Sequence, residues 1–209
     1  MRVERLSFIH RFEPAQEPSD RRVLLLLHGT GGDENQLIPL ARTLAPRSAL
    51  LSPRGKVMEN GNARFFRRLA EGVFDEEDLI FRAGELADFI TEACREYNLD
   101  CGNITAVGYS NGANIAAALM LLKPKALSEA VLFRPMVPLV PKQNPDLSGK
   151  RIFIAAGELD PMVPFEETTR LYDLLREFGA DVTLHWERAG HTLTDTDIQA
   201  AEAWMETGK

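Results

Sequence analysis

The sequence predicts an α/β fold, in which a mostly parallel sheet carries helices on both faces. Apolar runs of strand length alternate with helical patterns from residue 22 onward, which is the arrangement of such a sheet. The run over 23–27 is continuously apolar, as is typical of a parallel strand covered on both faces. A length of 209 residues fits one domain over 1–209 with a sizeable core.

The expected elements of the first half are an edge strand over 3–12, a polar turn over 14–20, a strand over 23–27, a helix over 33–44 with Asp33 as N-cap, a strand over 49–52, a long loop over 59–68 and a helix over 75–97. Those of the second half are strands over 104–107, 129–133, 151–156 and 181–187, and helices over 113–122, 165–178 and 195–205, with Gly179 ending the second of these helices. In such sheets ligands bind at the carboxyl ends of the strands, so residues directly after strands are candidates for the site.

Composition narrows the classes of function. The chain has 31 acidic and 24 basic residues, a net charge of −7, so we expect neither a nucleic-acid partner nor attraction to an anionic membrane. No apolar run is long enough to span a bilayer, and residues 1–5 lack the apolar core of a signal peptide. We therefore expect a cytoplasmic protein without membrane insertion.

The two cysteines, Cys94 and Cys101, lie in a helical pattern and in the turn after it. We expect a pair of reduced, small hydrophobic side chains, with a redox-sensing disulfide as the alternative. Because there is no C-x-x-C motif and no Cys/His cluster, we expect no metal site.

The clearest motif is G-x-S-x-G over 108–112, between an apolar β-type run and a helical run. In this setting the serine of the motif sits on a sharp strand-to-helix turn, which lifts its hydroxyl clear of the sheet. The helix that follows directs its N-terminus at the charge that develops when Ser110 attacks a carbonyl. Ser110 is therefore the candidate nucleophile.

A serine nucleophile needs a base and an acid that orients the base. Among the four histidines, only His191 lies in a loop after a late strand, whereas His28 opens a glycine turn and is expected to brace it. Asp160 follows a buried strand and precedes Pro161, and we prefer it over Glu158, Asp181, Asp195 and Asp197. The chain order of Ser110, Asp160 and His191 is that of the α/β-hydrolases.

The oxyanion hole is expected from two backbone amides. One belongs to Asn111, directly after the nucleophile, and the other to Thr30, in the first glycine turn. That turn lacks the Lys-Ser/Thr ending of a P-loop and the G-x-G-x-x-G spacing of a dinucleotide site, so nucleotide binding is not expected.

Five segments together resemble the phospholipase/carboxylesterase family of α/β-hydrolases, which includes acyl-protein thioesterases and bacterial carboxylesterases, and RFFRR at 64–68 with LFRPMVP at 132–138 is more similar to the bacterial branch. The five segments are LHGTGG at 27–32, SPRG at 52–55, GYSNG at 108–112, GELDP at 157–161 and AGHTLT at 189–194. The resemblance implies a serine esterase or thioesterase without a cofactor, with roles for Ser110, Asp160, His191 and the amides of Thr30 and Asn111. Family thioesterases usually have Gln where this chain has Asn111, a departure that concerns substrate preference.

The expected substrate is a small, water-soluble ester. The connection over 134–150 is too short for a helical cap, so we expect an α/β-hydrolase fold without a cap domain. Residues expected to contact the substrate are Arg54, Phe65, Phe66, Arg67 and Met136, and the arginines of the 64–68 loop would favour a polar or anionic group. The alternative for Arg54, Arg64, Arg67 and Arg68 is pairing with carboxylates of the surface. The alternatives are an acyl-thioesterase or lysophospholipase and a non-catalytic binding protein of this fold. The resemblance also allows a homodimer.

Overall fold

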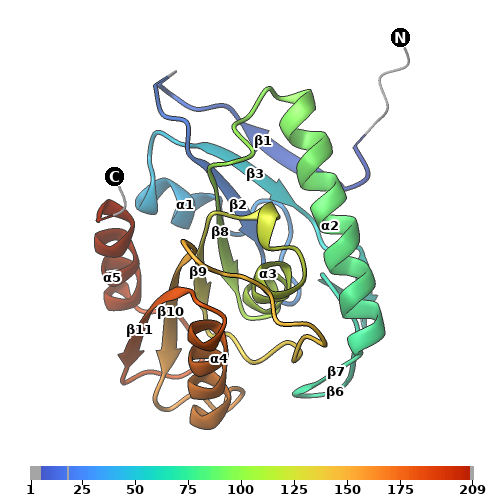
Figure 1. The fold of residues 1–209 in the computed structure, drawn as a ribbon, viewed down its shortest axis with the longest axis vertical. Helices are drawn as coiled ribbons and strands as arrows, with labels where there is room; N and C mark the ends of the chain where they lie inside the picture. The colour runs from blue at the N-terminus through green and yellow to red at the C-terminus, as the bar shows by residue number, and fades with distance from the viewer. Residues whose placement is uncertain (1–5, 18, 208–209) are drawn as a thin grey trace.

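The computed structural model of this chain describes residues 6–17 and 19–207 (Figure 1). Within these ranges a seven-stranded sheet has the order β1-β3-β2-β8-β9-β10-β11. Its strands are β1 (His10–Glu13), β2 (Val23–Leu27), β3 (Ala49–Pro53), β8 (Ile104–Tyr109), β9 (Glu129–Phe133), β10 (Arg151–Gly157) and β11 (Asp181–Glu187). All neighbouring strands pair in parallel except β1, which runs antiparallel to β3 at one edge. This is the fold class that the alternation of strand and helix patterns predicts.

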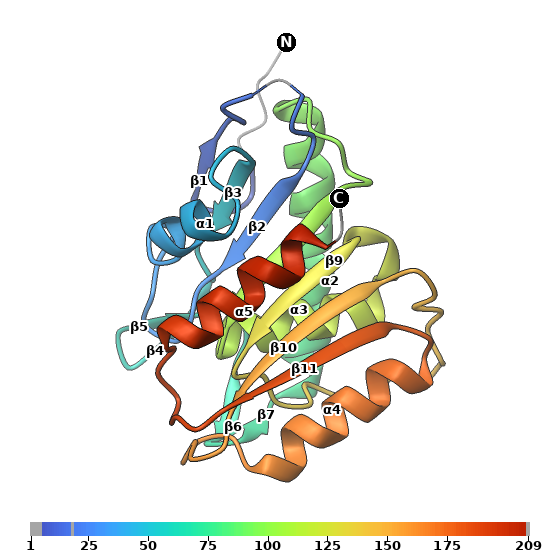
Figure 2. The same cartoon turned by 90° about the vertical axis from the view of Figure 1, so that its left-hand side faces the viewer.

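Helices cover both faces of the sheet (Figure 2). The helices α2 (Glu76–Glu96), α3 (Asn111–Leu122) and α4 (Phe165–Glu177) pack on one face, and α1 (Ile38–Leu44) and α5 (Asp195–Glu206) on the other. Successive side chains of β2 serve the two layers in turn, since Leu25 and Leu27 join the first core and Leu24 and Leu26 the second. A strand with both faces covered has no solvent side, which explains its unbroken run of leucines.

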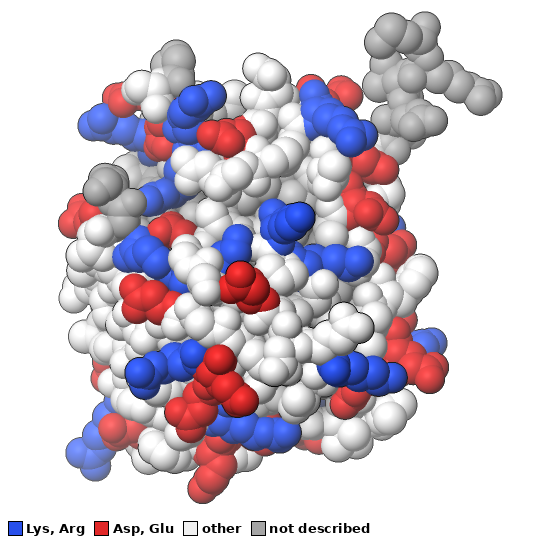
Figure 3. All heavy atoms as spheres, viewed as in Figure 1, with Lys and Arg blue, Asp and Glu red and all other residues white. Residues whose placement is uncertain are grey.

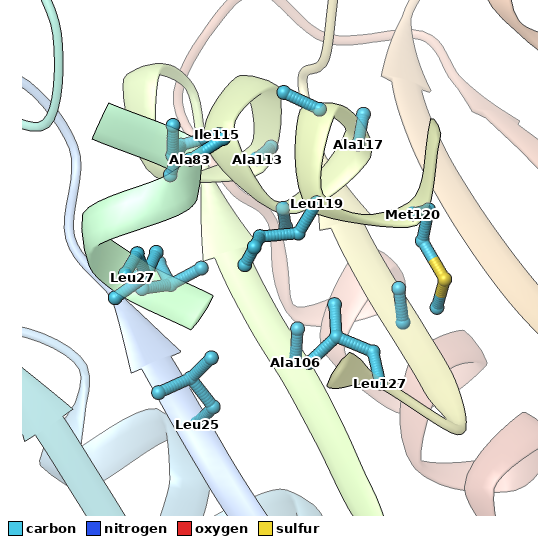
Figure 4. Close-up of a cluster of buried hydrophobic side chains, with 14 of the residues drawn as sticks. Leu25, Leu27, Ala83, Ala106, Ala113, Ile115, Ala117, Leu119, Met120 and Leu127 are labelled. Atoms are coloured by element: carbon cyan, nitrogen blue, oxygen red, sulfur yellow. The ribbon is translucent and has the colours of Figure 1, made fainter. Parts of the chain in front are cut away.

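Helix α3 lies between the sheet and α2, and its side chains from Asn111 to Leu121 are buried. Such a helix is apolar all round. Its short alanine side chains allow close approach, and Figure 4 shows Ala113 and Ala117 in the same cluster as Ala83 of α2 and Ala106 of β8. The N-terminus of this tightly held helix carries the serine of the G-x-S-x-G motif, so the core fixes the position of that turn.

Two expectations at the N-terminal side are wrong in their boundaries. Helix α1 begins at Ile38 rather than at residue 33, and the Asp33 carboxylate accepts a hydrogen bond from the Asn35 amide in the preceding turn instead of capping the helix. The edge strand begins at His10, because Phe8 leaves the sheet edge to pack on Phe89 of α2, with ring centroids 4.9 Å apart. Residues 3–5 of that predicted strand lie outside the described residues.

Residues 59–68, expected as a long loop, instead form parts of two small antiparallel hairpins. They are β4 (Val57–Glu59) with β5 (Asn62–Arg64), and β6 (Arg68–Ala70) with β7 (Val73–Phe74). Asn60 and Gly61 turn the first hairpin with φ values of 50° and 81°, as an Asn-Gly turn requires. Figures 1 and 2 both place β6 and β7 at the carboxyl end of the sheet.

The connection over 134–150 contains neither helix nor strand, as expected for a fold without a cap. The expectation of reduced cysteines is wrong, because Cys94 and Cys101 form a disulfide with Cα atoms 5.9 Å apart. The chain turns after α2, and this turn brings Cys101 close to Cys94, which lies seven residues earlier in the last turn of the helix.

The surface mixes charges of both signs. On the face in Figure 3, acidic and basic side chains are interspersed and neither sign forms a broad patch. Within the described ranges, none of the helices has the length and apolar character needed to cross a bilayer.

Candidate active site

The turn after β8 holds Ser110 in an unusual backbone conformation, with φ 52° and ψ −113°. This strain is typical of a nucleophile at a sharp strand-to-helix turn. Both flanking glycines are required by packing. A Cβ at Gly112 would lie 1.8 Å from the Leu27 carbonyl oxygen of β2, and a Cβ at Gly108 would lie 2.5 Å from the Gly112 carbonyl oxygen. The motif therefore lets the helix press against the sheet while the serine side chain stays free.

Three side chains predicted from the sequence meet at this turn. His191 Nε2 lies 2.9 Å from Ser110 Oγ, and His191 Nδ1 lies 2.7 Å from Asp160 Oδ2. The residues come from loops after β8, β10 and β11, whose carboxyl ends share one rim of the sheet. The Asp160 side chain is 1 % exposed and that of His191 17 %, so Asp160 is enclosed while His191 reaches the cleft.

Local hydrogen bonds hold Asp160 in place. Its second oxygen, Oδ1, accepts hydrogen bonds from the amides of Met162 and Val163, at 2.8 and 3.2 Å. Both carboxylate oxygens are thus occupied, and the oxygen that faces His191 has a fixed direction. In the tautomer in which Nδ1 donates to Asp160, Nε2 is free to accept the Ser110 hydroxyl proton.

The other candidate acids and His28 take no part in these contacts. Glu158 is exposed, and Asp197 is buried against Arg134. His28 Nδ1 bonds the Gly29 carbonyl at 2.7 Å, and its Nε2 accepts a hydrogen bond from the Gly55 amide at 2.9 Å. Because burial lowers the pKa of His28, this histidine stays neutral and links two loops.

The two amides expected to form an oxyanion hole are available. No hydrogen bond from the backbone N–H of Thr30 or Asn111 to another described residue is present. The end of β5 ties both residues down, because Arg64 Nη1 donates to Thr30 Oγ1 at 2.6 Å and the Phe65 amide donates to Asn111 Oδ1 at 2.7 Å. The hairpin segment therefore fixes both sides of the candidate hole, which the sequence did not indicate.

A buried ion pair supports the loop that carries His191. The Arg134 guanidinium donates to both Asp197 oxygens, at 3.0 and 2.6 Å, and both side chains are 0 % exposed. The same guanidinium donates to the carbonyls of Gly190 and Thr192, at 3.0 and 3.2 Å. Tyr109 donates its hydroxyl to the carbonyl between them, that of His191, at 3.1 Å. Three successive carbonyls of this loop, those of residues 190–192, therefore accept hydrogen bonds from side chains.

The pair Arg134–Asp197 could not be recognised as a support of the site from sequence. Burial alone would raise the pKa of Asp197, but hydrogen bonds from Arg134 and Thr194 outweigh it and hold that pKa below its ordinary value. Asp197 also completes a capping box with Thr194 at the start of α5. From the sequence, only the capping role of Asp197 could be predicted, because a Thr precedes this acidic residue by three positions.

A small cleft opens beside Ser110 and His191. Its other lining residues are Thr30, Arg64, Arg68, Glu71, Gly72, Phe74, Asn111, Asn114, Arg134, Met136, Met162 and Val163. Wider hollows lie at the opposite, amino ends of the strands, beside Asp20 and Arg22, and contain no nucleophile and base. Among the described residues no three His, Cys, Asp or Glu side chains are grouped as metal ligands.

Of the residues expected to contact substrate, the structure brings only Met136 to this cleft. Phe65 and Phe66 are instead buried in the core, because β5 turns them inward beneath the hairpin. Arg54 does not line the cleft, and its guanidinium donates two hydrogen bonds to the Glu34 carboxylate. Arg67 points to solvent and pairs with Asp75 and Asp78 at the start of α2.

The parallel sheet with its strained G-x-S-x-G turn between β8 and α3 defines the α/β-hydrolase fold. The chain belongs to the phospholipase/carboxylesterase family, whose model matches residues 12–208. It is therefore a member of a hydrolase family that includes carboxylesterases.

Individual relatives agree with this membership. The chain is 49 % identical over 184 residues to "Putative hydrolase MhqD" of Bacillus subtilis, covering 88 % of this chain and 92 % of that protein. The crystal structure of the Bacillus cereus carboxylesterase superposes with a TM-score of 0.93 at 51 % identity, covering 95 % of this chain and 93 % of that one. The structure of YahD with malic acid has a TM-score of 0.89 at 32 % identity, covering 95 % and 98 %.

Proposed function

We propose that this chain is a serine carboxylesterase that hydrolyses small, water-soluble carboxylic esters through an acyl-enzyme. The observation that carries the proposal is the unbroken hydrogen-bonded series from Ser110 through His191 to Asp160, beside two amides without acceptors. A serine, its base and the orienting acid at these separations are the parts that acyl transfer needs.

In the proposed reaction, His191 Nε2 takes the hydroxyl proton as Ser110 Oγ attacks the ester carbonyl. The carbonyl oxygen gains negative charge and is stabilised by two amides, that of Thr30 in the turn after β2 and that of Asn111 at the start of α3. Asp160 orients the imidazole and stabilises its protonated form. His191 then protonates the leaving alcohol, and a water molecule activated by the same histidine hydrolyses the acyl-enzyme.

The absence of a cap over the described residues supports a small substrate. The connection after β9 is irregular and short, and the hairpins of residues 57–74 border a cleft that also contains charged groups. YahD, a similar protein, has been solved with malic acid, a small, water-soluble acid, which also supports polar ligands of modest size.

The direct test is Ser110→Ala assayed with a series of 4-nitrophenyl esters from acetate to palmitate. We expect wild-type turnover to fall for long acyl chains, and Ser110→Ala to lower it on the order of a million-fold, as for other triad nucleophiles. Asp160→Asn should lower turnover strongly, on the order of ten-thousand-fold, with unchanged substrate binding. Preference for palmitate, or more than a few per cent of activity in Ser110→Ala, would contradict the proposal.

A matched pair of oxygen and thiol esters with one acyl group separates the esterase from the acyl-thioesterase. We expect the oxygen ester to be hydrolysed with at least comparable kcat/KM. A large and general preference for the thiol ester would assign the chain to the thioesterases of its family instead.

A further inference from the structure

One wall of the cleft beside Ser110 is rich in hydrogen-bond donors. Apart from Arg134, which is paired with Asp197, the most enclosed charged residue of this cleft is Arg64, whose side chain is 4 % exposed. The guanidinium donates from Nε to the Phe66 carbonyl at 3.3 Å and from Nη1 to Thr30 Oγ1 at 2.6 Å. Its Nη2 makes no hydrogen bond to any described residue, so donors remain for a ligand.

Two asparagines of the same wall also present donors. The Oδ1 atom of Asn111 accepts from the Phe65 amide at 2.7 Å, and that of Asn114 accepts from the Met136 amide at 2.8 Å. Because a backbone N–H can only donate, it fixes which end of each side-chain amide is the oxygen. The NH₂ ends are therefore the free ends, and Asn111 Nδ2 is buried with no acceptor in the described chain.

The positive charge of the wall exceeds the negative charge that faces it closely. Glu59 is the one carboxylate within 4 Å of Arg64 among the described residues, at 3.6 Å, and it is shared with Arg68, to which it lies at 3.0 Å. Burial and the neighbouring Arg68 lower the pKa of Arg64, while Glu59 opposes them. Glu71 also lines the cleft, but it is exposed to solvent, where its charge is screened.

Other charged groups of the cleft do not offer a site for an anion. The guanidinium of Arg134 is neutralised by Asp197, and His191 is engaged with Asp160 and Ser110. A ligand that complements the wall must bring acceptors and negative charge, and a carboxylate supplies both in a planar shape that matches a guanidinium. We name the set Arg64, Arg68, Asn111 and Asn114 the donor wall.

We propose that the donor wall is a subsite for a carboxylate group carried by the ester substrate. The proposal rests on the proposed function in that the ester occupies the same cleft, and it narrows the substrate class to esters with a free carboxylate. Since Arg64 also contacts Thr30, its loss affects every ester. Only a comparison of charged and neutral esters therefore isolates the subsite.

The test uses substrates that differ in one charge. In the first arm the carboxylate is on the acyl part, and mono-4-nitrophenyl adipate is compared with the neutral diester methyl 4-nitrophenyl adipate. In the second arm it is on the leaving group, and 4-acetoxybenzoate is compared with its methyl ester. We expect kcat/KM to be about tenfold or more higher for the charged ester in one arm, which identifies the part that carries the charge.

Three variants locate the preference. Asn114→Asp keeps the acceptor for the Met136 amide but replaces the donor with an oxygen, and Arg64→Gln removes the buried charge. Both should lower the charged-to-neutral ratio about tenfold. Arg67→Gln, in the same segment but paired outside the cleft, is the control and should leave the ratio unchanged.

The proposal is overturned by the absence of a preference in both arms, by a ratio that Arg64→Gln and Asn114→Asp leave unchanged, or by an equal loss in Arg67→Gln. The neutral esters test the proposed function separately: the wild type should hydrolyse them, and Ser110→Ala should not. Titration calorimetry with adipate tests the subsite without catalysis. Adipate should bind the wild type and bind Asn114→Asp about tenfold more weakly, and equal affinity for the two proteins would refute the subsite.

Discussion

The buried pair Arg134–Asp197 gives the sharpest prediction about stability. Asp197→Asn keeps the size of the side chain but leaves the Arg134 guanidinium, 0 % exposed, without a counter-charge. Removal of one partner from a buried ion pair costs about 3–5 kcal/mol, because the remaining charge stays desolvated. Domains of this kind unfold with about 5–15 kcal/mol in total, so the variant should lose a large part of its stability.

A second pair supplies the control. Arg47 and Glu17 also form an ion pair, at 2.9 Å, but their side chains are 64 % and 48 % exposed. Water screens such a pair, so Arg47→Met should cost about 1 kcal/mol or less. The double variant Arg134→Met/Asp197→Leu removes both buried charges, and it should be more stable than Asp197→Asn because no unpaired charge remains.

Urea denaturation with linear extrapolation measures the free energy of unfolding of each variant. A loss below about 1 kcal/mol in Asp197→Asn, similar to that in Arg47→Met, would refute the reasoning. Turnover measured well below the unfolding transition gives a second readout. Since Arg134 also holds the carbonyls on both sides of His191, the folded Arg134→Met should show a lower kcat than the folded Arg47→Met.

The pair also predicts a pH dependence. The pKa of Asp197 is held below its ordinary value, so the folded state keeps the carboxylate charged where the unfolded chain takes up a proton. The contribution to stability is therefore present above about pH 3.9, the unfolded reference, and is lost as the pH falls through the folded pKa. Asp197→Asn should remove this part of the acid sensitivity in the same urea titrations.

Three further outcomes follow from individual residues. Gly112→Ala should abolish folding or activity, because its Cβ would meet the Leu27 carbonyl. Gly84→Ala in α2, where nothing lies within 4 Å of the added Cβ, should instead add about 0.5–1 kcal/mol of stability. Circular dichroism and urea titration compare the two variants, and a stable, active Gly112→Ala would contradict the packing argument. Burial lowers the pKa of His28, so the unfolded chain protonates first and the free energy of unfolding should fall as the pH drops below about 6.5, by at most about 1.4 kcal/mol per pH unit. His28→Gln should flatten this slope between pH 7.5 and 5, and an unchanged slope would assign it to another group.

The sheet could be predicted because its strands are buried on both faces. An unbroken apolar run such as Val23–Leu27 has few alternatives to a covered parallel strand, and the structure contains it with the predicted bounds. The start of α1 was harder to predict. Asp33 has the side chain of an N-cap, but the same carboxylate can close a turn, and here it bonds the Asn35 amide. Local preference could not decide between these two uses.

The geometry of Ser110, Asp160 and His191 was accessible from sequence because topology brings them together. Residues that directly follow parallel strands share one rim, so three distant positions meet without any specific long-range pairing being known. The substrate side lacked such a rule. Arg64 and Arg67 lie three residues apart in one basic segment, yet one lines the cleft and the other pairs with the start of α2.

What separates these arginines is the path of the chain around them. The Asn60–Gly61 turn folds β4 onto β5, and this places Arg64 against Thr30 while Phe65 and Phe66 enter the core. An Asn-Gly pair is a readable hairpin signal, so the hairpin could have been predicted from the sequence. The burial of Arg64 could not, because arginine is almost never fully buried unless it is paired, and its contact with Thr30 joins segments 34 residues apart. Arg134 shows the same limit, since its partner Asp197 lies 63 residues further along the chain and has a sufficient local explanation as a helix cap. Tertiary contacts determine which charged side chains become enclosed. In this chain two such side chains, Arg64 and Arg134, lie beside the candidate nucleophile and base.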